Sequence, residues 1–290
     1  MAKTLDRCFA VITLYDPEPA CVENVRLISE QADAVYICDN SKTSHEKEYR
    51  IADNVRYLFY GENRGLSAAF NTVFREYASD FSDDDFIVFF DQDSTISEGH
   101  IKKLMTHFAK LEERGVRVGC LGPVYFNPYN DSVKLPRVRR KITGNVYAVE
   151  SVITSSMITR FHILKEAGFW NEHVFLDMAD WDLCWRIRKK GYLCCSDAGI
   201  LLTHRLGEDS RKEGKNKARS KRLFREYYQT REALYLLHQP YTPLRFRLKF
   251  LRQLTVSAAW RLLTFPEKKK RMEIYRRAAK DHKNGKIGPY

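Results

Sequence analysis

The first third of the chain alternates short apolar runs with stretches whose apolar residues recur at helical spacing. The apolar runs predict strands over residues 8–15, 34–41, 55–61 and 86–90. The helical spacing predicts helices over residues 21–31, 65–78 and 98–115. Continuous apolar strands alternating with helices are typical of a mostly parallel central sheet flanked by helices. The pattern therefore predicts an α/β fold.

The rest of the chain has a more mixed pattern. It predicts strands near 118–126, 146–154 and 199–204, and a helix from about Asp180 to Gly191. The charged segment 207–222 predicts a mobile loop. Helical segments follow at about 222–238 and 242–264, then a basic tail. We expect an α/β domain over 1–237 and a basic helical extension over 238–290.

Polar clusters follow three of the predicted strands at the point where each strand ends. They are Tyr15-Asp16, Asp39-Asn40-Ser41 and Asp91-Gln92-Asp93-Ser94. In parallel α/β sheets, ligands bind outside the carboxyl ends of the strands. The three clusters therefore indicate a site of nucleotide size at one edge of the sheet.

Asp91 and Asp93 place two carboxylates side by side at the end of a buried strand. Such hard oxygen donors suit Mg²⁺ or Mn²⁺, which bind few protein ligands and complete their shell with water and phosphate. A cation there would neutralise charge developing on a diphosphate leaving group. The alternative is a simple turn, because Asp and Ser are turn formers. The Asp-x-Asp pair alone does not distinguish a metal site from a simple turn.

Three more acids, Asp177, Asp180 and Asp182, lie at the start of a predicted helix. Acidic residues at this position can cap the helix. A carboxylate near the rim of the sheet can also act as a general base toward a hydroxyl. Mutual repulsion of three acids disfavours capping as their sole role. His204 follows an apolar strand, where a lone His is more often structural than a ligand.

Taken in order, these segments resemble the inverting, nucleotide-sugar-dependent glycosyltransferases of family 2 with the GT-A fold, and in particular their rhamnosyltransferase-like group. The segments that carry the resemblance are AVITLYDPE (10–18), VYICDNS (35–41), NRGLSAAFN (63–71), FFDQDS (89–94), GFWNEHVFLDMADWDLCWRIRKKGY (168–192), THRLGE (203–208) and REYYQTREALYLL (225–237). The resemblance covers roughly residues 9–237, and its ordered motifs are far more specific together than any one alone.

The resemblance implies roles for individual residues on the donor side. Donor contacts would come from Tyr15, Asp39, Asn63, Gly65, Asp91, Arg225, Tyr228 and Arg231. Of these, Tyr15, Asp39 and Asn63 would line the nucleoside pocket. Arg225, Tyr228 and Arg231 would approach the diphosphate, whose oxygens a guanidinium can bind bidentately. Asp93 would be the main protein ligand of Mg²⁺ or Mn²⁺, and His204 a second ligand.

On the acceptor side, the resemblance implies that Asp180 is the catalytic base, with Asp177, Trp181 and Asp182 around it. The base would deprotonate an acceptor hydroxyl, which attacks the anomeric carbon from the face opposite the leaving group, so that the configuration inverts. The sequence departs from the family pattern in three places. Leu14 stands where Thr is common, the acidic pair is Ala-Asp-Trp-Asp, and Arg231-Glu232 replaces the usual Arg-Asn.

Charge is distributed unevenly along the chain, whose net charge is +12. From Arg205 onward there are 24 Lys+Arg and 8 Asp+Glu, whereas the preceding part has 25 and 29. This asymmetry indicates a polyanionic partner, either nucleic acid or an anionic membrane surface.

Within the basic part, residues 242–265 can form a helix with Leu244, Leu248, Leu251, Ala258 and Leu262 on one face and Arg245, Lys249 and Arg252 beside it. Because Arg247 interrupts the apolar face, the sequence does not distinguish a helix that lies on a membrane surface from a helix that packs on the domain.

Cysteine usage bears on location. The seven Cys lie mostly in apolar runs and include no Cys-x-x-Cys pair, which favours a reducing compartment over disulfides or a zinc site. We find no signal peptide and no apolar run of about 20 residues that could span a bilayer. We therefore expect a cytoplasmic protein, peripheral at the inner face of the cell membrane.

Subgroup resemblance favours dTDP-rhamnose as the donor, a cell-surface polysaccharide or lipid-linked glycan as the acceptor, and no nucleic-acid partner. Alternatives are another donor such as a UDP-sugar, a metal-dependent nucleotidyltransferase, and a nucleic-acid-binding protein. A nucleic-acid-binding function leaves the acidic rim unexplained, since carboxylates repel phosphates. The sequence does not fix acceptor, linkage or oligomeric state.

Overall fold

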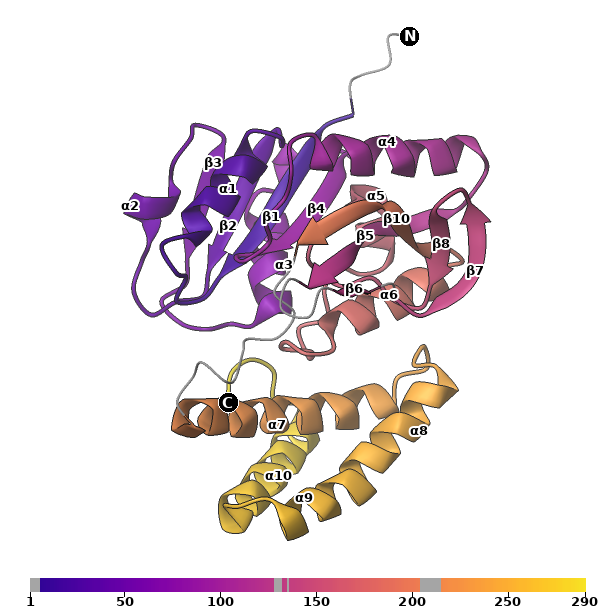
Figure 1. The fold of residues 1–290 in the computed structure, drawn as a ribbon. Coiled ribbons are helices and arrows are strands. Elements are labelled where there is room, and N and C mark those ends of the chain that lie inside the picture. The colour runs from indigo at the N-terminus through magenta and orange to yellow at the C-terminus, as the bar shows by residue number, and fades with distance from the viewer. Residues whose placement is uncertain (1–5, 128–131, 135, 204–214) are drawn as a thin grey trace.

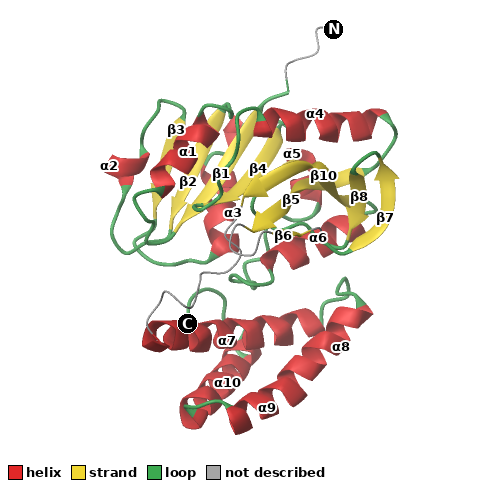
Figure 2. Ribbon diagram, viewed as in Figure 1, coloured by secondary structure: helices red, strands yellow, loops and turns green. Residues whose placement is uncertain are grey.

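The structure is a computed structural model that describes residues 6–127, 132–134, 136–203 and 215–290. Its centre is a ten-stranded sheet with helices on both faces (Figures 1 and 2). The strands lie in the order β3-β2-β1-β4-β9-β5-β10-β8-β7, and β6 pairs with β5. A layer of helices from the C-terminal part of the chain lies along one edge of this α/β part (Figure 1).

The first half of the sheet is parallel, as the apolar runs predict. Its strands are β1 (Cys8–Leu14), β2 (Ala34–Asp39), β3 (Val55–Phe59) and β4 (Phe86–Asp91). Its helices are α1 (Cys21–Ser29), α2 (Glu46–Tyr49), α3 (Leu66–Glu76), the 3-10 turn η1 (Ala78–Asp80) and α4 (His100–Glu113). The register sets Leu14 beside Asp39 and Thr13 beside Asp91, so the three strands end together.

The second half makes the sheet mixed. Its elements are β5 (Val118–Asn127), β6 (Ser132–Lys134), β7 (Val138–Thr143), β8 (Val146–Val149), β9 (Met157–Arg160), α5 (Phe161–Glu166), α6 (Ala179–Lys189) and β10 (Leu193–Thr203). Antiparallel β9 lies between β4 and β5, and antiparallel β7 and β8 form the far edge. The apolar pattern does not predict β7, because this strand is rich in Arg and Lys and mostly exposed.

The C-terminal layer consists of α7 (Lys215–Leu237), α8 (Leu244–Arg252), the π-helical turn η2 (Gln253–Ser257), α9 (Ala258–Thr264) and α10 (Lys268–Lys283). Residues 215–222 are helical, where the charge pattern predicts a mobile loop. Sequence periodicity also misses α10, which buries few apolar side chains. Because α7 packs on α10 and α8, the domain boundary at 237/238 stays a prediction.

Buried polar contacts join α7 and α10. Arg271 donates to Glu226 at 2.7 Å in a fully buried ion pair, and Tyr227 donates to Asp281 at 2.6 Å. Of the helices in the described part of the chain, none is long and apolar enough to cross a bilayer.

Aromatic side chains fix the layer against the α/β part. Phe246 of α8 packs 4.6 Å from Trp185 of α6, and Phe175 stacks on Tyr228 of α7 at 4.2 Å. The helical layer therefore lies directly against the segment that leads into α6.

Candidate active site

The polar clusters that follow β1, β2 and β4 meet at one rim of the sheet, as their position predicts. The backbone N–H of Asn40 donates to Leu14 at 2.9 Å, and that of Tyr15 donates to the Gln92 side chain at 2.7 Å. The Asp16 N–H donates to Ser41 Oγ at 2.8 Å. We call this edge the strand-end rim. Tyr15 stands exposed on it.

Asp91 and Asp93 lie on this rim in a tight turn, so the turn alternative describes the backbone correctly. The Ser94 N–H donates to the Asp91 carbonyl at 3.1 Å, and the Asp91 N–H donates to Ser94 Oγ at 3.2 Å. Ser94 is itself buried and hydrogen-bonded to Ser155. Both carboxylates are partly exposed. The turn thus holds two carboxylates at the edge where a ligand of a parallel sheet binds.

Asp39 has a different environment. Its carboxylate is fully buried and accepts hydrogen bonds from the Ser41 N–H at 2.8 Å, from His45 Nδ1 at 3.1 Å and from Tyr57. Burial opposes the charged form, but the hydrogen bonds from Ser41, Tyr57 and His45 outweigh it and lower the pKa of Asp39. Asp39 therefore shapes the loop after β2, and its contact with a nucleoside stays a prediction.

Asn63 and Gly65 form the entry to α3. Asn63 accepts from the Gly65 N–H at 2.9 Å, and Asn40 accepts from the Arg64 N–H at 3.0 Å. Gly65 has φ +81°, and a Cβ there would lie 2.6 Å from the Phe175 carbonyl oxygen. Only glycine fits this close approach. It lets the segment before α6 reach the rim.

Asp180 lies at the start of α6, where its Oδ1 accepts from the Trp181 N–H at 2.7 Å. Burial of the carboxyl group, the neighbouring Cys184, and the charges of Asp91 and Asp177 raise the pKa of Asp180 to about 8. Part of its surface remains exposed. The structure therefore brings Asp180 close enough to Asp91 for the charge of Asp91 to act on its carboxyl group.

Tyr125 of β5 belongs to the same neighbourhood, and sequence analysis missed it. Its ring is buried, and its hydroxyl donates to the Ser155 carbonyl at 3.4 Å. Burial and the charges of Asp180 and Asp91 raise the pKa of Tyr125. The only signal in the sequence was a Tyr near the end of a predicted strand.

The other two acids of the α6 region, Asp177 and Asp182, each have polar partners of their own. Asp177 accepts from Arg225 at 3.2 Å and from Gln229 at 2.9 Å. Asp182 is fully buried and accepts from Arg186 at 2.7 Å and from Tyr241 at 2.6 Å. An acceptor-side role for either residue stays a prediction.

Trp181, also predicted on the acceptor side, packs against α8. Its ring lies 5.1 Å from Phe246, and Lys249 Nζ lies 4.3 Å from its centre. Because Trp181 follows Asp180 directly, α8 lies close to the part of the rim that contains Asp180.

Two of the three residues expected at the diphosphate are buried in α7 contacts. Tyr228 stacks on Phe175 and accepts from the Tyr290 N–H at 2.8 Å. Arg231 donates to the Gly288 carbonyl at 2.8 Å, while its Nε and Nη2 lack a partner among the described residues. Arg231 also lines a cavity of about 240 Å³ with His173, Tyr235, His282, Gly285 and Lys286. Arg225 alone of the three is exposed, beside Asp177.

The rim suits a divalent cation. Asp91 and Asp93 supply hard carboxylate oxygens at an exposed edge of the sheet, which are the ligands that Mg²⁺ and Mn²⁺ prefer. His204, the other predicted ligand, lies outside the described residues.

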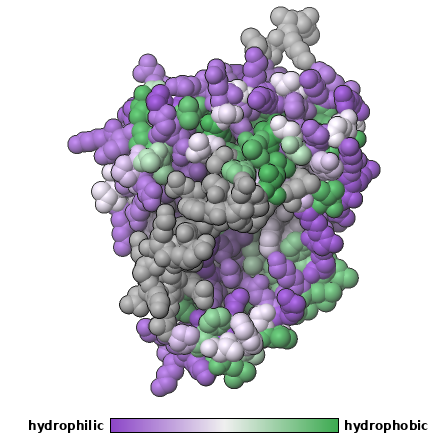
Figure 3. Space-filling view, viewed as in Figure 1, coloured by the Kyte–Doolittle hydropathy of each residue, from purple (hydrophilic) through white to green (hydrophobic). Residues whose placement is uncertain are grey.

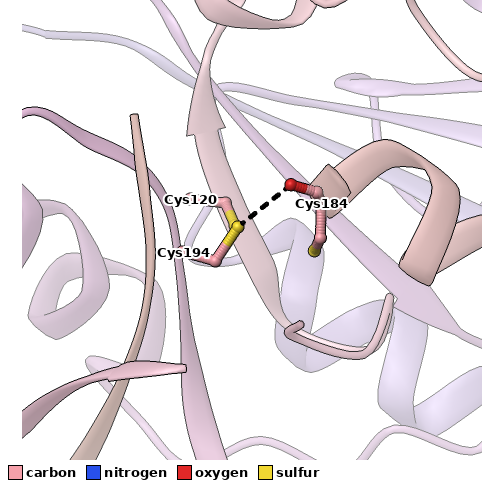
Figure 4. A group of neighbouring side chains, drawn as sticks. All are labelled: Cys120, Cys184 and Cys194. Atoms are coloured by element: carbon pink, nitrogen blue, oxygen red, sulfur yellow. Dashed lines mark hydrogen bonds between the residues drawn. The ribbon is translucent and has the colours of Figure 1, made fainter. Parts of the chain in front are cut away.

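Three cysteines form the one group in the described ranges whose ligand atoms lie close enough to share an ion. Cys120, Cys184 and Cys194 have these atoms within 4.8 Å of one another (Figure 4). All three are buried in the core, and Cys194 donates to the Cys184 carbonyl at 3.6 Å. They fill the space between β5, β10 and α6, as small apolar side chains do.

Comparison with known proteins decides the family. The sequence model of Glycosyl transferase family 2 matches residues 11–165, which is more than half of the chain. The chain belongs to glycosyl transferase family 2. It is therefore a glycosyltransferase, which disfavours the nucleotidyltransferase alternative.

One relative and two solved structures add detail. A dTDP-rhamnosyl transferase, RfbF of Shigella flexneri, is 27% identical over 285 residues, covering 93% of this chain and 92% of the relative. The crystal structure of GalNAc-T7 with UDP, GalNAc and Mn²⁺ matches with a TM-score of 0.56 at 12% identity, covering 91% of this chain. This chain spans 59% of that one. Residues 1–349 of TarS from S. aureus match with a TM-score of 0.49 at 14% identity, covering 97% and 92%.

These findings confirm the family resemblance, the glycosyltransferase activity and the GT-A fold. The family match contains the rim from Tyr15 to Asp93 and ends before α6. Assignments to Asp180 and to α7 therefore rest on geometry.

Proposed function

We propose that this family 2 glycosyltransferase moves a sugar from a nucleotide-sugar to a hydroxyl of a growing cell-surface polysaccharide or lipid-linked glycan, with inversion. The observation that carries the proposal is the meeting of Asp91 on β4 and Asp180 on α6 at one rim. A carboxylate whose pKa lies near 8 binds a proton readily, as a general base must.

In this mechanism Asp180 takes the proton of the acceptor hydroxyl. The hydroxyl oxygen forms a bond to the anomeric carbon on the face opposite the diphosphate, while the bond from that carbon to the diphosphate oxygen breaks. The electron pair of the broken bond stays on the diphosphate, and Asp180 carries the proton. Attack from the opposite face inverts the configuration.

Asp91 and Asp93 would hold Mg²⁺ or Mn²⁺, which supplies positive charge for the departing diphosphate. Arg225 is the exposed guanidinium beside the rim, and if it moves from Asp177 to a phosphate oxygen, Asp177 keeps its hydrogen bond from Gln229. Tyr15, exposed on the rim, would face the nucleoside.

The donor we propose is dTDP-rhamnose. Its support is the name of the relative from Shigella flexneri, which aligns over nearly the whole chain. A UDP-sugar is the alternative donor, because the solved structure of similar fold was crystallised with UDP and Mn²⁺.

We also propose that the protein works in the cytoplasm, peripherally at the inner face of the cell membrane, where lipid-linked acceptors are carried. The strongly basic C-terminal layer supports this location. A nucleic-acid partner for the same charges would appear as a gel shift at physiological salt, and we expect none.

A donor screen tests the proposal. We would measure nucleoside diphosphate release from dTDP-, UDP- and GDP-sugars with Mg²⁺ or Mn²⁺, with and without EDTA. Slow metal-dependent hydrolysis of dTDP-rhamnose, lost in Asp93→Ala, is the expected result. If hydrolysis requires an acceptor, thermal-shift measurements with the bare nucleotides would still detect binding at the donor site. Absence of both hydrolysis and a nucleotide-dependent shift would rule the proposal out.

A further inference from the structure

Helices α8 and α9 and the turn η2 between them form one helical rod, residues 244–264, on the outer side of the C-terminal layer (Figure 1). One face of the rod packs inward through Phe246 and Phe250, which are buried against Trp185. The attachment of α8 to the α/β part therefore does not use its leucines.

A second face of the rod is apolar and exposed. Its six large side chains are each between 46% and 74% exposed: Leu244, Leu248, Leu251, Val256, Trp260 and Leu263. We call them the outer apolar stripe. The five-residue step from Leu251 to Val256 crosses η2, where i→i+5 hydrogen bonding widens the turn and keeps the later residues near the leucines. In Figure 3, hydrophobic surface appears at the lower right and bottom, where Figure 1 places these helices.

Basic residues flank the stripe, and no acid interrupts it. Residues 244–264 contain Arg245, Arg247, Lys249, Arg252 and Arg261 and no Asp or Glu. Arg245 pairs with Glu150, and Arg247 donates to backbone carbonyls. Lys249 and Arg252 are exposed. A helix with exposed Leu and Trp on one side and Lys and Arg beside them has the composition of helices that lie in an anionic lipid interface.

We propose that the outer apolar stripe docks this protein on an anionic bilayer surface. The rod lies parallel to the membrane plane, the leucines and Trp260 enter the headgroup–acyl boundary, and Lys249 and Arg252 contact lipid phosphates. A second copy of the chain fits the stripe poorly. A two-fold interface would bring the same exposed cations of both copies together with no acid between them.

Docking of this kind places the acceptor side of the site near the membrane. Trp181, next to Asp180, contacts Phe246 and Lys249 of the same rod. Only the link to a lipid-linked acceptor rests on the proposed function. Vesicle binding itself requires no donor and no catalysis.

The test is flotation of the full chain with phosphatidylglycerol–phosphatidylcholine vesicles and with phosphatidylcholine vesicles alone. We expect binding to the anionic vesicles that weakens with salt, and at least a tenfold loss in the double variant Leu248→Glu/Leu263→Glu. Arg252→Gln should weaken binding about fivefold, since one cation near the surface is worth about a factor of five. The control is Ile287→Glu, an exposed apolar position outside the stripe, which should float like the wild type.

Sedimentation velocity of the same proteins completes the test. The proposal is overturned by failure of the wild type to float, or by unchanged flotation of the double variant. A wild-type dimer that the double variant dissociates, without vesicle binding, would assign the stripe to a second copy instead. Donor hydrolysis without vesicles reports the proposed function separately, and the double variant should retain it.

Discussion

Asp180 at the strand-end rim and Glu226 in the C-terminal helical layer have opposite surroundings. Glu226 receives two hydrogen bonds from Arg271 and one from Tyr275, so this buried carboxylate has a partner of opposite sign. At the rim, burial raises the pKa of Asp180, and the like charges of Asp91 and Asp177 add to this effect. Facing carboxylates lower stability unless a ligand relieves them. The contrast supports the proposal that the rim binds a ligand, whereas the Glu226–Arg271 pair joins two helices.

The largest effect we expect comes from removing the proposed base. Asp180→Asn keeps the shape of the side chain but cannot accept the proton, so transfer to an acceptor should fall about 10²- to 10⁴-fold. Binding of the nucleotide should persist, because Asp180 is assigned to the acceptor. Steady-state transfer kinetics check this, with Glu273→Gln in the exposed part of α10 as the control. Full activity in Asp180→Asn would remove Asp180 from the mechanism.

The two faces of α8 offer a second comparison, in stability. Phe250→Ala empties a fully buried position against Trp185 and should lower the free energy of unfolding by about 3–5 kcal/mol. Leu248→Ala removes an exposed side chain and should change the free energy of unfolding by less than about 0.5 kcal/mol. Urea unfolding measures both. Equal losses in the two variants would mean that the exposed leucines are packed in solution.

A substitution at Gly65 tests the close contact between α3 and the segment before α6. Gly65→Ala must adopt φ +81° and place Cβ 2.6 Å from the Phe175 carbonyl oxygen, which should cost about 2–3 kcal/mol of stability. Gly99→Ala is the matched control, because Gly99 also has positive φ but open space around a Cβ. Gly99→Ala should lower the free energy of unfolding by about 1 kcal/mol. A difference near zero between the two would argue against the close approach at Gly65.

The smallest effect concerns pH. Burial raises the pKa of both Asp180 and Glu232 to about 8, so the folded protein holds protons that the unfolded chain releases near pH 4. Their stabilisation is complete below about pH 4 and is lost as pH rises through about 8. Asp180→Asn should flatten this decline by about 1–2 kcal/mol between pH 7 and 9, measured by urea unfolding. An unchanged slope would place the Asp180 pKa near its ordinary value.

The sequence predicted the parallel half of the fold well, because β1, β2 and β4 are continuous apolar runs that end in polar clusters. It predicted neither β7 nor α10, because β7 is an exposed edge strand rich in Arg and Lys and α10 is held by ion pairs rather than by an apolar stripe. Local composition does not encode such contacts.

For the candidate site, the sequence predicted Asp91, Asp93 and Asp180, and the charge of Asp91 acts on Asp180 in the structure. It could not show that Asp182 and Arg231 are buried in packing contacts, because their partners Tyr241 and Gly288 lie more than 50 residues away in the chain. Tyr125 was missed for the same reason, since its proximity to Asp91 and Asp180 depends on the position of β5.

The measurement that tests the central claim most directly is calorimetric binding of dTDP and UDP in the presence of Mn²⁺. The wild type should bind dTDP, Asp93→Ala should lose this binding, and Leu248→Glu/Leu263→Glu in the helical layer should keep it. That pattern would locate the donor at the strand-end rim. Binding that survives Asp93→Ala, or absence of binding by the wild type to either nucleotide, would contradict the account.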